Sequence, residues 1–388
     1  MAQQHIQLGT PPAGTDGDTA RQAFAKAEEN FNDLYGLVVG DGSGTSLDER
    51  VDVIESAIAL ALGKNKLING NFDFWQRGWG PFTVTGYGPD RWNCAFNALT
   101  GAGIQAYVVG AGDANFKTGA FACSVNNTGN SDGTNHFFIM TQKIENVNTF
   151  NGQTVSFSAT VFNAGAAGRQ IAVEFLQEFG TGGSATVTGI SPKKFTLAAG
   201  INHISGQVTL PSTAGKTIGN ANHCLSMVLW FSGGSSYSAR NGSLGAQSGQ
   251  LYIGEVQLER GTVPSNFEVR PLGVELVLCQ RYCEKSFQLD VFPGTLSNLG
   301  RFSIGISSAV NADMFVSVPF KVTKRVAPAV ALWGTGLTSS AGTVGQDDGS
   351  LISASISHVG VHQFQVNWKN TASRWGGFFH FISDAEIP

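Results

Sequence analysis

The hydrophobic pattern of this chain changes its period at residues 67–78, LINGNFDFWQRG. Before this stretch, apolar residues recur every three or four positions, which is typical of amphipathic helices. After it, apolar and polar residues alternate in segments such as 153–161 and 170–175, and Gly, Asn and Ser separate the segments. The pattern predicts a mainly β fold behind short N-terminal helices. Phe72 and Phe74 predict that 67–78 is the first strand, with Trp75 facing the other side.

The composition favours many short strands joined by polar turns. Charged residues make up 13% of the chain, and 50 of its 388 residues are glycine. An ordinary soluble domain carries about 25% charged residues and about 7% glycine. Because helical surfaces usually carry Lys and Glu, a surface poor in both fits β structure.

Charge and cysteine content narrow the class of protein. The 24 basic and 28 acidic residues are dispersed and give a net charge of −4, so no basic block predicts binding to nucleic acid. No apolar run of about 20 residues predicts a membrane span, and the first residues lack the charged and apolar regions of a secretion signal. We therefore expect assembly in the cytoplasm. Five scattered cysteines predict buried thiols and not a disulfide framework.

Residues 1–45 and 46–63 each predict one helix. In the first, Asp18 or Thr19 is suited to cap a helix that ends at Gly36. Its apolar stripe includes Phe24, Phe31 and Leu34. In the second, Ser46 and Glu49 form a capping box ahead of a heptad-like seam of Leu47, Val51, Ile54 and Ile58. Since β-branched core residues shift coiled coils towards trimers, the seam predicts a short trimeric coiled coil.

Two β domains follow the helices. Residues 64–271 predict a jelly-roll sandwich whose closing strand is 251–259. Residues 272–286 predict a short connecting helix. Residues 287–388 predict a second, C-terminal β domain that contains Trp333, Trp368 and Trp375.

Several motifs, in order along the chain, resemble those of bacteriophage tail fibres. The motifs are IQLGT at 6–10, DGD at 16–18, AFAK at 23–26, NFNDLY at 30–35, 67–78 with DRW at 90–92, EVQLE at 255–259, FEVRP at 267–271, ELVLCQRY at 275–282, KRVAP at 324–328 and SDAEI at 383–387. The middle ones resemble the carbohydrate-binding-module-like jelly roll of such fibres.

The resemblance implies a structural virion protein of the phage tail. The sequence departs from that of long fibres in having no extended repetitive shaft. It implies a homotrimer that is fixed to other tail or baseplate proteins by residues near the N-terminus: Phe24, Phe31, Leu34 and Tyr35. The β domains would then face the bacterial surface, with the C-terminal domain as the receptor-facing tip.

Candidate enzyme sites are weak, so we expect no catalysis. The G-x-S-x-G pattern at 129–133 lies in a polar loop and not at a strand-to-helix elbow. A glycosidase needs two carboxyl groups roughly 5–10 Å apart. Glu255 and Glu259, or Glu174 and Glu178, would lie about 13 Å apart on one strand.

Metal and cofactor sites are equally sparse. His358 and His362 would share a strand face without converging on a metal, and we expect no cofactor. A structural Ca²⁺ held by Asp73 and Glu255 is conceivable only by analogy with sugar-binding jelly rolls.

Tryptophans near turns are the candidate ligand contacts, because an aromatic ring can stack on a sugar while amides bind its hydroxyls. Trp75 and Trp92 are expected in the core, with Arg77 or Arg91 paired to Asp73 or Asp90. The residues next to glycines, Trp79, Trp333 and Trp375, are the candidates for glycan or receptor binding.

The sequence thus favours a trimeric tail-fibre protein of the virion that attaches to a bacterial glycan or surface protein by multivalent binding without catalysis. Two alternatives remain. One is a purely structural tail or baseplate component, and the other is a glycan-cleaving tail enzyme.

Overall fold

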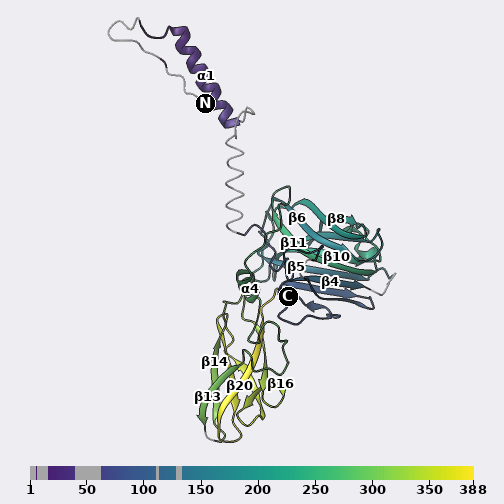
Figure 1. Ribbon diagram of the computed structural model, residues 1–388, viewed down its shortest axis with the longest axis vertical. Helices are drawn as coiled ribbons and strands as arrows, with labels where there is room; N and C mark the ends of the chain where they lie inside the picture. The colour runs from purple at the N-terminus through teal and green to yellow at the C-terminus, as the bar shows by residue number, and fades with distance from the viewer. Residues whose placement is uncertain (1–5, 7–15, 40–62, 111–112, 128–132, 309) are drawn as a thin grey trace. The chain divides into compact units, whose positions relative to one another are not determined.

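The structure, a computed structural model of the chain, describes residues 6, 16–39, 63–110, 113–127, 133–308 and 310–388 (Figure 1). The chain divides into two compact units, residues 1–64 and residues 65–388. In the first unit, helix α1 spans Ala20–Val39, three residues beyond Gly36. The predicted coiled coil at 46–63 falls almost wholly outside the described residues.

The start of α1 is fixed by a reciprocal cap. The backbone N–H of Gln22 donates to the hydroxyl of Thr19, and the Gln22 side chain accepts from the backbone N–H of Thr19. This arrangement is a capping box, which satisfies donors that the first helical turn leaves without partners. Phe24 and Phe31 lie exposed on the helix.

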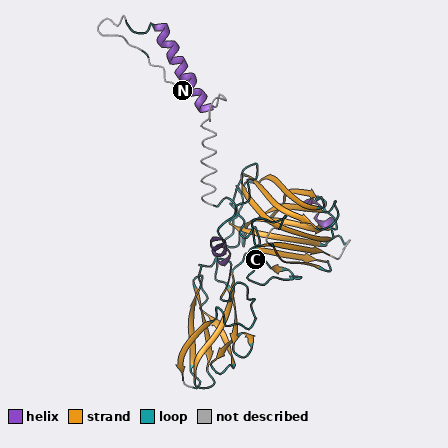
Figure 2. Cartoon of the chain, viewed as in Figure 1, coloured by secondary structure: helices purple, strands orange, loops and turns teal. Residues whose placement is uncertain are grey.

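The second unit is mainly β (Figure 2) and begins with a two-sheet antiparallel sandwich. The first sheet has the order β1 (Gly86–Tyr87), β2 (Trp92–Asn97), β5 (Phe137–Glu145), β10 (Cys224–Gly233), β7 (Gln170–Glu178) and β8 (Val187–Thr196). The second has the order β3 (Ala102–Val108), β4 (Phe121–Asn127), β11 (Gly249–Arg260), β6 (Thr154–Asn163) and β9 (Gly200–Thr209).

One continuous apolar core lies between these sheets. Trp75 and Trp92 are both part of it, as the sequence predicts. All five cysteines are free and buried, which confirms the prediction of buried thiols. Burial raises the pKa of Cys224 to about 12, so this thiol stays protonated and unreactive near neutral pH.

The prediction that 67–78 forms the first strand is wrong. Asn69 and Phe72 have φ values of 57° and 59°, which turn the backbone out of the extended region. The Asn69 side chain holds the turn, since its amide donates to the carbonyls of Phe74 and Asp90 and its oxygen accepts from the N–H of Phe74. At Gly70, a Cβ would lie 2.2 Å from the carbonyl oxygen of Val256, so only glycine allows this approach to β11.

A short helical segment covers the outer face of the first sheet. It consists of η1 (Ser235–Tyr237) and α3 (Ser238–Asn241). Beneath it, Trp230 is buried, and its indole N–H donates to the carboxylate of Glu174. Arg240 of α3 forms an ion pair with Glu174 at 2.5 Å. The pair ties the segment to the sheet.

Helix α4 (Leu272–Gln280) follows the sandwich, but it is shorter than the predicted helix at 272–286. Residues Cys283–Lys285 instead form strand β12, which pairs with the end of β20. All three β12 residues are buried, so pairing with a distant strand overrides the local helical preference.

The C-terminal strands form one curled sheet around a second core. Their order is β14 (Asp313–Pro319), β19 (Gln363–Lys369), β18 (Leu351–Ser357), β17 (Thr343–Gln346), β20 (Arg374–Asp384), β15 (Ala329–Thr335) and β16 (Ser339–Ala341), with β12 and β13 (Phe302–Ser308) also on β20. Phe364, Val366 and Phe381 lie in the core that this sheet encloses.

Ion pairs connect the last residues of the chain to the start of the sandwich. Arg91 pairs with Glu386 and lies over the ring of Tyr282. Arg77 pairs with Asp384 at 2.7 Å and lies 3.7 Å from Asp90, as expected for one of the predicted arginine–aspartate pairs. Burial raises the pKa of Asp90 to about 6, while Arg77 opposes this shift.

Within the described ranges, no helix combines the length and the apolar character that crossing a bilayer requires.

Candidate functional site

One face of the C-terminal sheet carries an exposed aromatic ring among amides and hydroxyls. Along β14, Met314, Val316 and Val318 pack on or within the core, so Phe315 points to the opposite, outer face. Phe315 is 68% exposed. It is paired across the ladder with Asn367 of β19, which is paired in turn with Ser355 of β18.

The polar groups beside Phe315 form a hydrogen-bonded row. The Gln365 amide donates to the Asn367 side-chain oxygen, and the Asn367 amide donates to the Ser357 hydroxyl at 2.8 Å. These bonds hold the two amide side chains in fixed orientations on the sheet. A planar ring beside oriented amides is the combination that binds the apolar face and the hydroxyls of a sugar.

At one end of these C-terminal strands lie the connections between β13 and β14, between β15 and β16, between β17 and β18, and between β19 and β20. We call this end, which carries Trp375 and lies next to Phe315, the aromatic end. The backbone N–H of Asn311 donates to Asn370, Arg374 forms an ion pair with Asp348, and the N–H of Leu337 donates to Gly349. Trp375, at the start of β20, is 69% exposed at this end. Val310 and Leu337 are exposed there too, and Phe315 lies close by on β14.

The other two predicted tryptophans are more enclosed. Trp79 is 39% exposed and packs edge-on against Phe292 and tilted against Phe121. Trp333 is half-buried and packs edge-on against Phe287. Trp333 is paired with His380, five residues along β20 from Trp375, so the two tryptophans lie about 16 Å apart along the strand. Trp333 and Trp375 therefore do not form one site.

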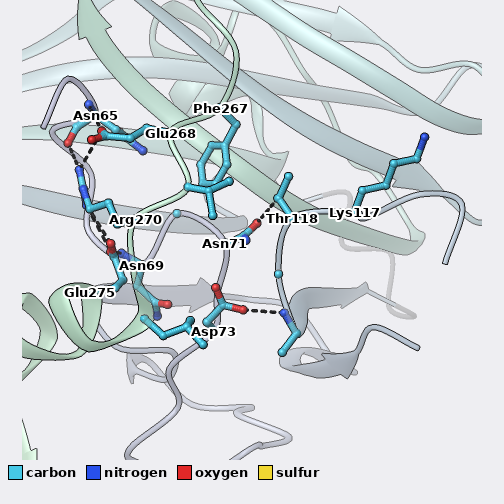
Figure 3. Close-up of a pocket in the computed structure, with 15 residues that line it drawn as sticks. Asn65, Asn69, Asn71, Asp73, Lys117, Thr118, Phe267, Glu268, Arg270 and Glu275 are labelled. Atoms are coloured by element: carbon cyan, nitrogen blue, oxygen red, sulfur yellow. Dashed lines mark hydrogen bonds and ion pairs between the residues drawn. The ribbon is translucent and has the colours of Figure 1, made fainter. Parts of the chain in front are cut away.

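A cavity of about 230 Å³ lies in the sandwich domain, between residues 65–73, 117–120 and 267–275 (Figure 3). It is smaller than the roughly 300–1,000 Å³ of sites for drug-sized ligands. Asn71, Asp73, Arg270 and Glu275 line it together with Phe267.

The polar groups of the cavity mainly hold the chain itself together. Arg270 donates to the backbone carbonyl of Leu67 and pairs with Glu275 at 3.1 Å, and Glu268 accepts from the N–H of Asn65 at 2.7 Å. Figure 3 shows these side chains aligned along one side of the cavity. Arg270, Glu268 and Glu275 therefore use their hydrogen bonds to hold residues 65–69 in place. We assign these side chains a structural role and not ligand binding.

Asp73 and Glu255, the predicted Ca²⁺ ligands, both accept hydrogen bonds from the loop at residues 118–120. Asp73 accepts from the N–H of Ala120 at 2.8 Å, and Glu255 accepts from the hydroxyl of Thr118 at 2.8 Å. Burial raises the pKa of Asp73, and the bond from Ala120 opposes this shift. Across the residues with assigned positions, no three His, Cys, Asp or Glu side chains gather as a metal site would require. The calcium site stays a prediction.

The other carboxylates and histidines that the sequence offered as catalytic or metal-binding groups each bind a different partner. Glu174 is held by Arg240, Glu178 accepts from Ser226, and Glu259 accepts from Ser265. His358 lies next to the hydroxyl of Ser357, whereas His362 lies next to that of Thr323. The G-x-S-x-G stretch lies almost entirely outside the described residues.

Phe315 is not among the ligand contacts predicted from the sequence, which are tryptophans next to glycines. The signal was present in the alternation of Asp313–Pro319, DMFVSVP. Once Met314, Val316 and Val318 are assigned to the core face, Phe315 must share the other face with Asp313 and Ser317. The strand pattern therefore places this aromatic ring on the exposed, polar face of β14.

Comparisons with known proteins gave matches only among solved structures. No protein-family model and no curated protein sequence matches this chain. The enzymatically active domain of tailspike protein 4 of bacteriophage CBA120 matches with a TM-score of 0.31 and 11% identity, over 51% of this chain and 22% of that one. The present chain thus spans about a fifth of the length of that protein.

Two smaller proteins match over nearly their whole length. A family 11 carbohydrate-binding module from Clostridium thermocellum, in complex with a β-1,3-1,4-mixed-linked tetrasaccharide, has a TM-score of 0.28 and 11% identity, over 48% of this chain and 97% of that one. A putative sugar binding protein from Bacteroides thetaiotaomicron has a TM-score of 0.31 and 12% identity, over 51% and 100%. At such low TM-scores, none of these similarities bears on the function of this chain.

Proposed function

We propose that this chain is a phage tail-fibre protein that attaches the virion to a bacterial surface glycan by multivalent, non-catalytic binding. The observation that carries the proposal is the exposed ring of Phe315 beside the oriented amides of Gln365 and Asn367. Trp375 adds a second exposed ring at the aromatic end. The order of tail-fibre-like motifs along the sequence supports the virion assignment.

A surface of this kind binds weakly through each copy. Enclosing an aromatic side chain contributes about 1.5–3 kcal/mol, and an open sheet face encloses only part of a sugar. Several copies held together would gain avidity through their effective concentration. Weak single sites therefore fit a fibre that acts as a multimer.

Exposed residues near the N-terminus fit attachment to the tail. Phe24 and Phe31 lie seven residues apart on α1, so both project on one side of the helix. Their exposed rings would be covered by another tail or baseplate protein in the virion. The side chains of Leu34 and Tyr35, proposed for the same contact, are outside the described part of the chain.

An array of lipopolysaccharide O-chains and capsular polysaccharides tests glycan binding by the full chain. We expect saturable binding to a subset of glycans and a loss of roughly tenfold or more in affinity for Phe315→Ser, since 1.4 kcal/mol corresponds to tenfold. Trp375→Ser should weaken binding as well.

Val326→Ser is the matched control. Val326 is exposed in the same domain, next to Arg325, which donates to the carbonyls of Ala385 and Glu386 near the opposite end of β20. This variant should bind as the unaltered chain does. Equal binding by all variants, or binding to no glycan, would overturn the proposed site. Release of new reducing ends from a bound glycan would instead favour the enzyme alternative.

A further inference from the structure

The exposed side of helix α4 is entirely apolar. Its exposed residues are Leu272, Gly273, Val274 and Val277, and its one charged residue, Glu275, turns inward to pair with Arg270. A helix at a water-exposed surface normally carries polar and charged residues on its outer side. Val269, just before the helix, continues the apolar surface. We call Val269, Leu272, Val274 and Val277 the α4 patch; their exposed fractions are between 49% and 59%.

The α4 patch lies where the chain enters the sandwich. Residues Asn65 and Leu67 are bound by Glu268 and Arg270, which flank Val269 directly. The patch is therefore fixed to the first residues of the second unit. Any arrangement that brings residue 65 of several copies together brings their α4 patches together too.

The sequence ahead of Asn65 supplies a reason for such an arrangement. The heptad-spaced residues Leu47, Val51, Ile54 and Ile58 predict association of copies through 46–63. The apolar spacing of this seam continues to Ala61, and Asn65 follows only four positions later, a stretch that spans at most about 14 Å. Copies joined by the seam must therefore hold their Asn65 residues close to a common axis.

We propose that the α4 patches of associated copies pack against one another and continue the predicted seam into the β region. The occupant of each patch is thus another copy of this chain. About two heptads make a marginal coiled coil on their own, and an apolar contact directly after the seam would add to its stability. This inference uses the predicted seam and does not depend on glycan binding.

Val269 and Leu272 also belong to the lining of the sandwich cavity, so the contact would place another copy beside that cavity. The aromatic end of the C-terminal domain would be unaffected.

Disulfide crosslinking of the full chain tests the contact. All five native cysteines are buried, so Val274→Cys introduces an accessible thiol that can report on neighbouring copies. Under mild oxidation we expect a covalent dimer that forms in high yield and whose yield does not fall on dilution. Val108→Cys, on an exposed apolar position of β3, is the matched control and should crosslink poorly.

A second measurement covers the case in which an introduced thiol is poorly oriented. Val274→Ser with Val277→Ser should lower the protein concentration range over which the oligomer persists, as judged by mass in solution. Val108→Ser should leave that range unchanged. The inference is overturned by a monomeric full chain, by equal crosslinking at positions 274 and 108, or by an oligomer that the two serines do not weaken.

Discussion

At the scale of single residues, the face of a strand decides what an aromatic side chain does. Trp368 and Phe315 lie on neighbouring strands, but Trp368 points into the core and donates its indole N–H to Asn370, while Phe315 points outward. Alternation in the sequence contains this information once the core face is known. Residue type and a neighbouring glycine do not predict the exposure of a side chain. Trp333, for example, is half-buried although a glycine follows it.

His380 gives a prediction at this scale. Its ring is buried against Phe287, Nε2–H donates to the carbonyl of Ser297, and Nδ1 accepts from the hydroxyl of Ser286. Burial lowers the pKa of His380 below its ordinary value of 6.5. The unfolded chain therefore binds a proton at a pH where the folded chain does not, and stability present above about pH 6.5 is lost as the pH falls.

Chemical denaturation at pH 7.5 and pH 5 measures this effect. The free energy of unfolding of the unaltered chain should fall relative to that of His380→Gln as the pH drops. Asp90, whose raised pKa of about 6 gives the opposite slope, is present in both proteins and cancels in the comparison. If the free energies of unfolding of the two proteins depend on pH in the same way, the pKa of His380 is not lowered in the folded chain.

At the scale of elements, the local sequence pattern predicts strands that have one polar face. It does not predict the conformation of a segment that depends on a partner far away in the sequence. The switch to β structure after residue 63, the core positions of Trp75 and Trp92, and the buried thiols follow from periodicity and composition. Strand β12 does not, because its conformation depends on pairing with β20, about 100 residues later. Residues 67–78 alternate like a strand, yet the side chain of Asn69 and the close approach at Gly70 impose turns.

The contact between α3 and the first sheet gives a prediction for an element. Glu174 is completely buried, and Arg240 is the cation that pairs with it. Arg240→Ala would leave a buried carboxylate without its cation, which costs about 3–5 kcal/mol in free energy of unfolding. Thermal or denaturant unfolding measures the loss.

The control for this prediction is Lys369→Ala. Lys369 pairs with Asp313 at 3.8 Å, and both side chains are exposed, so its loss should change stability by less than about 1 kcal/mol. Equal effects of the two substitutions would mean that Glu174 finds other partners or water when Arg240 is removed.

At the scale of the whole molecule, features with different roles occupy different stretches of the chain. Exposed phenylalanines lie on α1, the predicted seam and the α4 patch lie around the start of the sandwich, and the aromatic end belongs to the C-terminal domain. This order along the chain fits the proposed function. Residues near the N-terminus would contact the tail, the stretch after them would associate with other copies, and the C-terminal strands would bind the glycan. The proposed function requires association, because a single open face would bind a sugar weakly, whereas several copies held together gain avidity.

The rate of dissociation from an immobilised bacterial polysaccharide tests this central claim most directly. The full chain should be compared with a variant in which Leu47, Val51, Ile54 and Ile58 are all serine. The unaltered protein should have a mass three times the 40.9 kDa of one chain and should dissociate about 10²–10⁴-fold more slowly than the variant. Equal dissociation rates, or an unaltered protein that is monomeric, would contradict multivalent attachment.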